Sequence, residues 1–69
     1  MSISFKEFNS AVNSKILKND NGKFKNHEKF DSICKLNLML YLDKKYNFSI
    51  SFEQIEKIES LKDLNKLIK

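Results

Sequence analysis

The most hydrophobic stretch of the chain is DSICKLNLMLYLDKKY, residues 31–46. Large apolar and aromatic side chains recur along it at helical spacing: Leu36, Leu38, Met39, Leu40, Leu42 and Tyr46. This pattern predicts a helix with one broad buried face. Asp31 is a natural N-cap beside the positive end of the helix dipole, and Lys44 and Lys45 suit the negative end. We expect this stretch to be the central helix.

An earlier helix is predicted by apolar residues spaced three, four and four apart, at Phe5, Phe8, Val12 and Ile16. It opens with a capping box, in which the Ser4 hydroxyl accepts from the Glu7 amide and Glu7 bonds back to the Ser4 amide. We expect it to end near residues 19–22, where Asn and Asp precede the only glycine. The polar, lysine-rich residues from there to Phe30, interrupted by Phe24, read as a surface loop held by one or two aromatic side chains.

After the central helix, Phe48 and Ile50 read as parts of an extended linker that pack inward. Ser51 and Ser60 each begin a Ser-x-x-acid/amide pattern typical of a helix start. The two helices that follow carry apolar residues at helical spacing: Phe52, Ile55 and Ile58 in the first, and Leu61, Leu64, Leu67 and Ile68 in the second. We therefore expect one all-α domain over residues 1–69, a small four-helix bundle. It has two long and two short helices, with a long loop between the first and second.

Composition excludes several classes of protein. The chain has 69 residues, 13 lysines and no arginine against 9 acids, and a net charge of +4. Cys34 and His27 are the only residues of their kinds, so a disulfide framework or a zinc site is not expected. The longest apolar run, residues 38–42, is far too short to span a bilayer. We expect a cytoplasmic monomer without membrane association, and not an enzyme, because no nucleophile has a base nearby in the pattern.

The candidate site is Asp31-Ser32-Ile33, where the loop meets the central helix. A serine in this position ordinarily caps the helix. It could also carry a phosphodiester, because its oxygen lies near free backbone amides and the positive end of the dipole.

From Asp31 to Ile68 the chain resembles the acyl carrier protein family, without a gap over 38 of 69 residues. The family pattern is Asp-Ser-Leu/Ile, helically spaced apolar residues, a charged cluster ending in an aromatic, an isoleucine, a short acidic helix and a Ser/Thr-apolar helix start. It reads here as Asp31-Ser32-Ile33, Leu36, Leu38, Leu42, Asp43-Lys44-Lys45-Tyr46, Ile50, Glu53-Gln54-Ile55-Glu56-Lys57-Ile58 and Ser60-Leu61-Lys62-Asp63-Leu64. The first 30 residues match only in layout.

The resemblance implies that Ser32 receives 4′-phosphopantetheine from coenzyme A, added by a phosphopantetheinyl transferase. The thiol of this arm would hold an acyl or aminoacyl group as a thioester, loaded by an activating ligase and passed to downstream transferases or synthases. Asp31 would help bind the transferase and its metal, although the chain itself holds none. Recognition of partners is implied for Asp31, Ile33, Cys34, Asn37, Met39 and Asp43. Five apolar residues would line the interior and possible cargo space, with ordinary core as their simpler interpretation: Phe48, Ile50, Ile55, Ile58 and Leu64.

The chain departs from the family in its charge. Family members are typically acidic, whereas the carboxylate positions of the central helix are here Cys34, Asn37, Asp43 and Lys44. Because this chain is basic, the like charge of a basic patch on a partner enzyme would repel it, which would weaken and slow docking. This favours a specialised biosynthetic pathway over housekeeping fatty acid synthesis.

Two other readings stay open. A lysine-rich helical module could bind nucleic acid, since residues 1–30 carry six lysines against three acids. The absence of arginine disfavours it, because arginine serves base readout and phosphate clamping best. In the other reading, the chain keeps the carrier fold without the modification and serves as an interaction domain.

Overall fold

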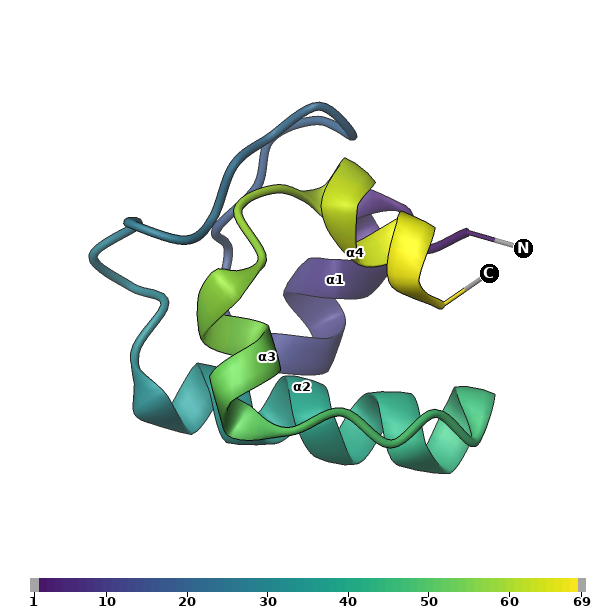
Figure 1. The fold of residues 1–69 in the computed structure, drawn as a ribbon. Helices are drawn as coiled ribbons and strands as arrows, with labels where there is room; N and C mark the ends of the chain where they lie inside the picture. Colours follow the sequence, from purple (N-terminus) through teal and green to yellow (C-terminus); the bar gives the residue numbers. More distant parts are fainter. Residues whose placement is uncertain (1, 69) are drawn as a thin grey trace.

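The computed structural model describes residues 2–68, which contain four helices and no strand (Figure 1). The helices are α1 (Phe5–Val12), α2 (Ser32–Tyr46), α3 (Phe52–Lys57) and α4 (Leu61–Leu67). The predicted all-α class is confirmed. The prediction of two long helices is wrong, because α2 has 15 residues while α1 has only 8, close to the 6 of α3 and the 7 of α4.

Helix α1 ends earlier than its apolar spacing predicts. Asn13 adopts a left-handed conformation with φ of 56°, which asparagine tolerates better than most residues, and closes the helix. The Asn9 side chain then accepts from the amides of Ile16 and Leu17 and donates to the Leu17 carbonyl. These backbone groups are thereby satisfied outside a helix, so Ile16 is buried in the following segment rather than in α1.

The starts of the helices follow their capping residues. Ser51 and Gln54 form both hydrogen bonds of a capping box at α3, and the Ser60 hydroxyl accepts from the Asp63 amide at α4. At α1 the Ser4 hydroxyl accepts from the Glu7 amide as predicted. The predicted second bond of the capping box, from the Ser4 amide to the Glu7 carboxylate, is absent. The Glu7 carboxylate is bonded to side chains of α2 instead.

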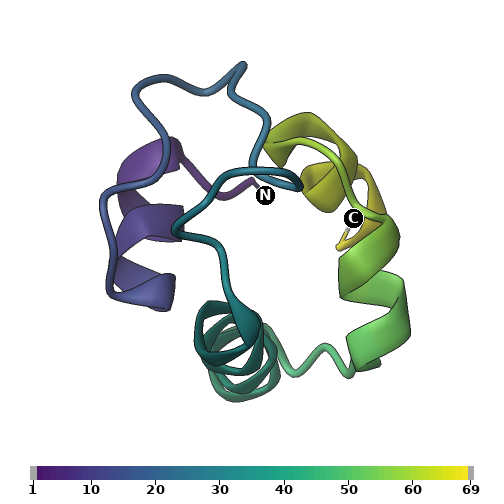
Figure 2. The same cartoon turned by 90° about the vertical axis from the view of Figure 1, so that its left-hand side faces the viewer.

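Helix α2 contacts both α1 and α3 and lies along one edge of the fold in Figure 1. Figure 2 looks nearly along its axis, with α1 on one side and α3 on the other. Cys34, Leu38 and Leu42 form its buried face, to which the other elements add the rest of one core cluster. These further core residues are Ile3, Phe8, Val12, Ile16, Leu17, Phe24, Phe30, Ile50, Ile55, Ile58, Leu61 and Leu64.

The segment between α1 and α2, residues 13–31, is held to the body by aromatic packing and backbone bonds. Phe24 stacks on Phe8 with ring centroids 4.5 Å apart, and Phe30 meets Phe24 edge-on at 4.9 Å. The amide of Phe24 donates to the Glu59 carbonyl, and that of Leu61 donates to Gly22. The segment is thus fastened to the connection between α3 and α4, beside which it passes in Figure 1.

A polar cluster joins the first turn of α1 to the last turns of α2. The Glu7 carboxylate accepts from the hydroxyls of Tyr41 and Tyr46 and lies 3.2 Å from the Lys45 amine. Burial raises the pKa of Glu7, but the hydrogen bonds from Tyr41, Tyr46 and Lys45 outweigh it, so this pKa lies below its ordinary value. The bond to Glu7 raises the pKa of Tyr46 to about 12. The cluster is therefore held by one ionised carboxylate with three donors.

The two ends of the described chain are joined by one side chain. The Asn65 amide group accepts from the Ile3 amide at 2.7 Å and donates to the Ile3 carbonyl at 3.1 Å. The first described residues are thereby fixed against α4.

Candidate functional site

Asp31 caps α2, as predicted. Its carboxylate accepts from the Cys34 amide at 3.0 Å, and its backbone is extended. This bond is the largest cause of a lowered pKa for the Asp31 carboxyl. The site therefore begins with an ionised carboxylate on the first turn of the helix.

Ser32 is the first residue of α2 and is exposed. Its hydroxyl forms no hydrogen bond with any side chain or backbone group of residues 2–68. The ordinary interpretation of Ser32 as the helix cap is wrong, because Asp31 already occupies the cap position. The arrangement leaves a free hydroxyl in solvent at the end of a helix whose first amides carry partial positive charge.

The side chain of Cys34, unlike that of Ser32, points into the core. Its side chain is 6% exposed, and its Sγ lies 3.2 Å from the Lys29 carbonyl and 3.6 Å from that of Val12. Burial raises the pKa of the thiol. With so little of its side chain exposed, Cys34 is placed chiefly as a core residue, and its part in partner recognition stays a prediction.

Other predicted recognition residues do reach the surface of α2. Ile33 and Asp43 are exposed, and Asn37 and Met39 are half-buried. Asp31, Ile33, Cys34 and Asn37 are brought together in the lining of one shallow depression of about 340 Å³, which also includes Val12, Asn13, Ser14 and Lys29.

Leu36 and Leu40 correct the prediction of a single broad buried face. They are 49% and 60% exposed, and Ile33, three residues before Leu36, is 68% exposed. Because spacings of three and four place residues on one side of a helix, these three side chains form a continuous strip, here called the outer stripe. The sequence carried a signal for it, since residues 33–42 hold more apolar side chains than one helix face accommodates.

The five residues predicted to line an interior belong to the core region. Ile50, Ile55, Ile58 and Leu64 are buried, and Phe48 packs against them from a half-buried position. Ile50 borders a depression of about 230 Å³ with Met39 and Asp43, and Ile58 borders one of about 370 Å³ with Gln54 and Lys57. The five side chains are therefore placed as core residues, two of which reach the floor of surface depressions.

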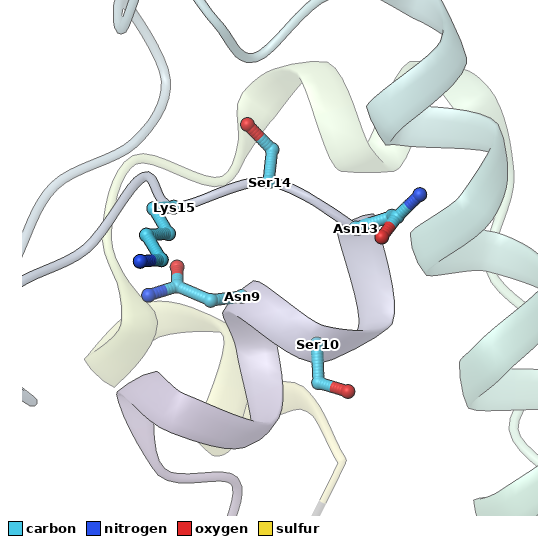
Figure 3. Close-up of a pocket in the computed structure, with 5 residues that line it drawn as sticks. All are labelled: Asn9, Ser10, Asn13, Ser14 and Lys15. Carbon is cyan, nitrogen blue, oxygen red and sulfur yellow. The ribbon is translucent and has the colours of Figure 1, made fainter.

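A further depression, of about 490 Å³, lies at the end of α1 and is shown in Figure 3. It is lined by Asn9, Ser10, Asn13, Ser14 and Lys15. The side chains point in different directions rather than toward one position, with Ser10 and Ser14 turned apart (Figure 3). Asn9 is already engaged in its bonds to Ile16 and Leu17. The depression therefore presents no set of polar groups directed at one ligand.

The lysines ahead of α2 all face solvent. Lys15, Lys18, Lys23, Lys25 and Lys29 are exposed, and each lies between α1 and α2 rather than on a helix. His27 lies half-buried in the same segment, where its Nδ1 accepts from the Lys29 amide.

Comparisons with known proteins add no assignment: no protein-family model, curated protein or solved structure matches the chain. In residues 2–68, no helix combines the length and hydropathy needed to cross a membrane. Nor does that part of the chain bring together three His, Cys, Asp or Glu side chains that could hold a metal ion.

Proposed function

We propose that the protein is an acyl or aminoacyl carrier whose Ser32 bears a 4′-phosphopantetheine arm. The observation that carries the proposal is the free, exposed Ser32 hydroxyl at the start of the longest helix, directly after an aspartate that does the capping itself. The order Asp31-Ser32-Ile33 and the residues that follow it supply the resemblance to carrier proteins.

The attachment forms one phosphodiester. The Ser32 oxygen attacks the phosphorus that bears the pantetheine arm, the pyrophosphate bond of coenzyme A breaks, and adenosine 3′,5′-bisphosphate leaves while the serine proton passes to a base of the transferase. The product anion lies near the first amides of α2, which favour negative charge. Asp31 has the same sign as the phosphodiester, so its proposed role is in the complex, where the transferase's metal ion offsets both charges.

The arm then supplies the chemistry of a carrier. Its terminal thiol holds the cargo as a thioester, which keeps the carbonyl electrophilic, and partner enzymes perform the reactions. The proposed partners are the transferase, an acyl- or aminoacyl-activating ligase, and downstream transferases or synthases.

The charge of the chain supports a specialised pathway. The net charge is +4, and the outward positions of α2 offer little negative charge to a basic partner surface. Equal loading and elongation by housekeeping fatty acid synthesis enzymes on this protein and on an acidic carrier would contradict this part of the proposal.

Mass spectrometry tests the attachment directly. The protein is incubated with coenzyme A and a broad-specificity phosphopantetheinyl transferase, and wild type should gain one phosphopantetheinyl group. Ser32→Ala should gain nothing, whereas Ser49→Ala, at another exposed serine, should gain the same mass as wild type. Wild type that stays unchanged with several transferases would defeat the carrier proposal and leave an unmodified interaction domain.

A second candidate function is nucleic-acid binding, favoured by the five exposed lysines between α1 and α2. Such binding depends on salt, because phosphate contacts release counterions. A gel-shift assay on generic duplex decides between the two: a salt-sensitive shift favours this candidate, and no shift at low salt removes it.

A further inference from the structure

A depression of about 350 Å³, here called the lysine depression, lies where the segment between α1 and α2 meets the connection between α3 and α4. It is lined by Lys23, Lys25, Asn26, His27 and Glu59. His27 is half-buried and the other four residues are exposed. The carrier proposal uses none of these side chains.

The backbone beneath the lysine depression is held in place. Phe24, between the two lysines, is fully buried. The amides of Phe24 and Lys25 both donate to the Glu59 carbonyl, at 2.9 and 3.3 Å, and Lys23 forms an antiparallel bridge with Ser60. The two lysines therefore extend from a fixed frame, and a fixed frame loses less conformational entropy when a ligand binds.

His27 is oriented by its neighbours. Its Nδ1 accepts from the Lys29 amide at 3.1 Å. Its amide donates to the Phe24 carbonyl at 3.1 Å, and its carbonyl accepts from the Phe30 amide at 2.9 Å. A neutral imidazole whose Nδ1 accepts carries its proton on Nε2. The ring nitrogen left for a ligand is therefore a donor.

The cations of the lysine depression have no acidic partner. Within residues 2–68 the lysines that form ion pairs are Lys35 and Lys45, not Lys23 or Lys25. With a neutral His27, the two lysines and the single Glu59 give the lining a charge of 2 − 1, or +1. Two ammonium groups and an imidazole N–H are complementary to an anion that offers several oxygens.

We propose that Lys23, Lys25 and His27 bind a phosphate group. A phosphate carries close to two negative charges and three acceptor oxygens, which match two ammonium groups and one N–H, whereas a carboxylate has only one charge for them. The group belongs either to a small phosphorylated compound or to a nucleic-acid backbone. This inference does not rest on the carrier function, because Ser32 takes no part in it.

The test is a nuclear magnetic resonance titration of the full chain with inorganic phosphate. At about pH 8 an ordinary imidazole is neutral and phosphate is close to doubly charged. The chain has one histidine, so its ring nitrogens are assigned without ambiguity. We expect saturable shifts at the amides of residues 23–27 and at Nε2 of His27, and none from sodium chloride at the same ionic strength.

Two sets of variants test the donors. Lys23→Gln combined with Lys25→Gln should raise the Kd for phosphate by about tenfold, because each exposed charge contact contributes up to about fivefold. Lys44→Gln combined with Lys62→Gln removes the same charge from exposed lysines of α2 and α4 and should leave the Kd unchanged. His27→Asn keeps an acceptor for the Lys29 amide but does not reach the position of Nε2, so it should weaken binding several-fold.

Glu59 supplies a test of opposite sign. Glu59→Gln removes the only acid of the lining and should tighten phosphate binding by about two- to fivefold. Glu53→Gln, at an exposed residue of α3, changes the net charge equally and should have no such effect. The same spectra show whether each variant keeps the fold, since the signals of residues far from the depression should not move.

Titration with a short DNA duplex identifies the source of the phosphate. Shifts confined to residues 23–27 assign the site to a nucleic-acid backbone, and no shift with the duplex, where phosphate itself binds, assigns it to a small phosphorylated compound.

Three results overturn the proposal. The first is the absence of saturable shifts with phosphate. The second is an equal loss of binding in the variant of Lys44 and Lys62, which makes net charge responsible. The third is a duplex footprint that spreads over Lys15, Lys18 and Lys29, which makes the whole lysine-rich segment the binding surface.

Discussion

The carboxylate of Glu7 accepts a hydrogen bond from the hydroxyl of Tyr46, which joins the first turn of α1 to the last residue of α2. The same carboxylate also accepts from Tyr41 and pairs with Lys45. The carboxylate is thus directed through its Oε2 across the helix–helix contact and does not complete the capping box with Ser4. The short helix α1 depends on this contact more than on its own length.

Glu7→Gln should destabilise the protein by about 1–2 kcal/mol, because hydrogen bonds to a charged acceptor are stronger than those to an amide. The amide also brings two donors to a position that already has three. Urea unfolding at neutral pH measures the change. Glu28→Gln, at an exposed residue of the segment between α1 and α2, should leave the midpoint where it is. Equal effects of the two substitutions would show that net charge, not the cluster, is responsible.

Stability should fall at both ends of the pH range. The pKa of Glu7 is lowered in the folded protein, so its contribution is complete above the unfolded value near 4.5 and is lost as pH falls through the lower folded value. Tyr46 and Lys45 have pKa values raised to about 12, so their contribution is complete below about 10 and is lost as pH rises toward 12. Melting temperatures across pH measure both losses. Glu7→Gln should flatten both, and a wild-type-like profile in that variant would contradict the assignment.

Asp31 combines a structural and a proposed recognition role, and two substitutions separate them. Asp31→Asn keeps a good helix cap and should preserve stability within a few tenths of a kcal/mol, while Asp31→Ala should cost about 1 kcal/mol. Both remove the carboxylate proposed to serve the transferase, so both should slow loading of Ser32. Denaturation and timed mass spectrometry provide the two readouts. If only Asp31→Ala slows loading, the aspartate acts through helix stability alone.

The thiol of Cys34 should react slowly in the native protein. It is buried, and its raised pKa leaves less of the reactive thiolate at neutral pH. A chromogenic thiol reagent should find no fast-reacting group before loading, one after loading by the transferase, and two after loading and unfolding. Fast reaction of the unloaded native protein would show that Cys34 is accessible.

Phe24 should be among the most sensitive positions between α1 and α2. It is fully buried and stacked on Phe8, and loss of a buried phenylalanine costs about 3–5 kcal/mol. Phe24→Ala should therefore unfold much of so small a domain, and Phe24→Leu should fold with a lower melting temperature. Lys25→Ala, at the exposed neighbour, should be neutral. Equal melting temperatures for Phe24→Leu and wild type would contradict the packing.

Much of the helical layout could be predicted because helix starts are chosen by local chemistry. Asp31, Ser51 and Ser60 each bond an amide three residues ahead, and this information lies within one turn. The end of α1 depends instead on Asn9, which binds backbone groups seven and eight residues away. Ile16 continues the helical spacing and is buried, yet it reaches the core from outside the helix, so periodicity alone misplaced it.

The candidate site was predictable in position but not in orientation. Asp31 and Ser32 lie at the start of α2, as their order in the sequence requires. Which face of α2 meets the core is decided by where α1 and α3 pack, and this information is spread over the whole chain. For that reason Cys34 was expected outside and lies inside, while Leu40 was expected inside and lies outside.

The link from Asn65 to Ile3 determines where further segments could be attached to the domain. Segments joined to either end would leave from neighbouring points, and in Figure 1 this edge lies across the view from the start of α2. A tether, a fusion partner or a peptide that closes the chain into a ring could be attached there with little distortion. Ser32 would remain exposed to solvent, where each of the proposed partner enzymes could reach it in turn.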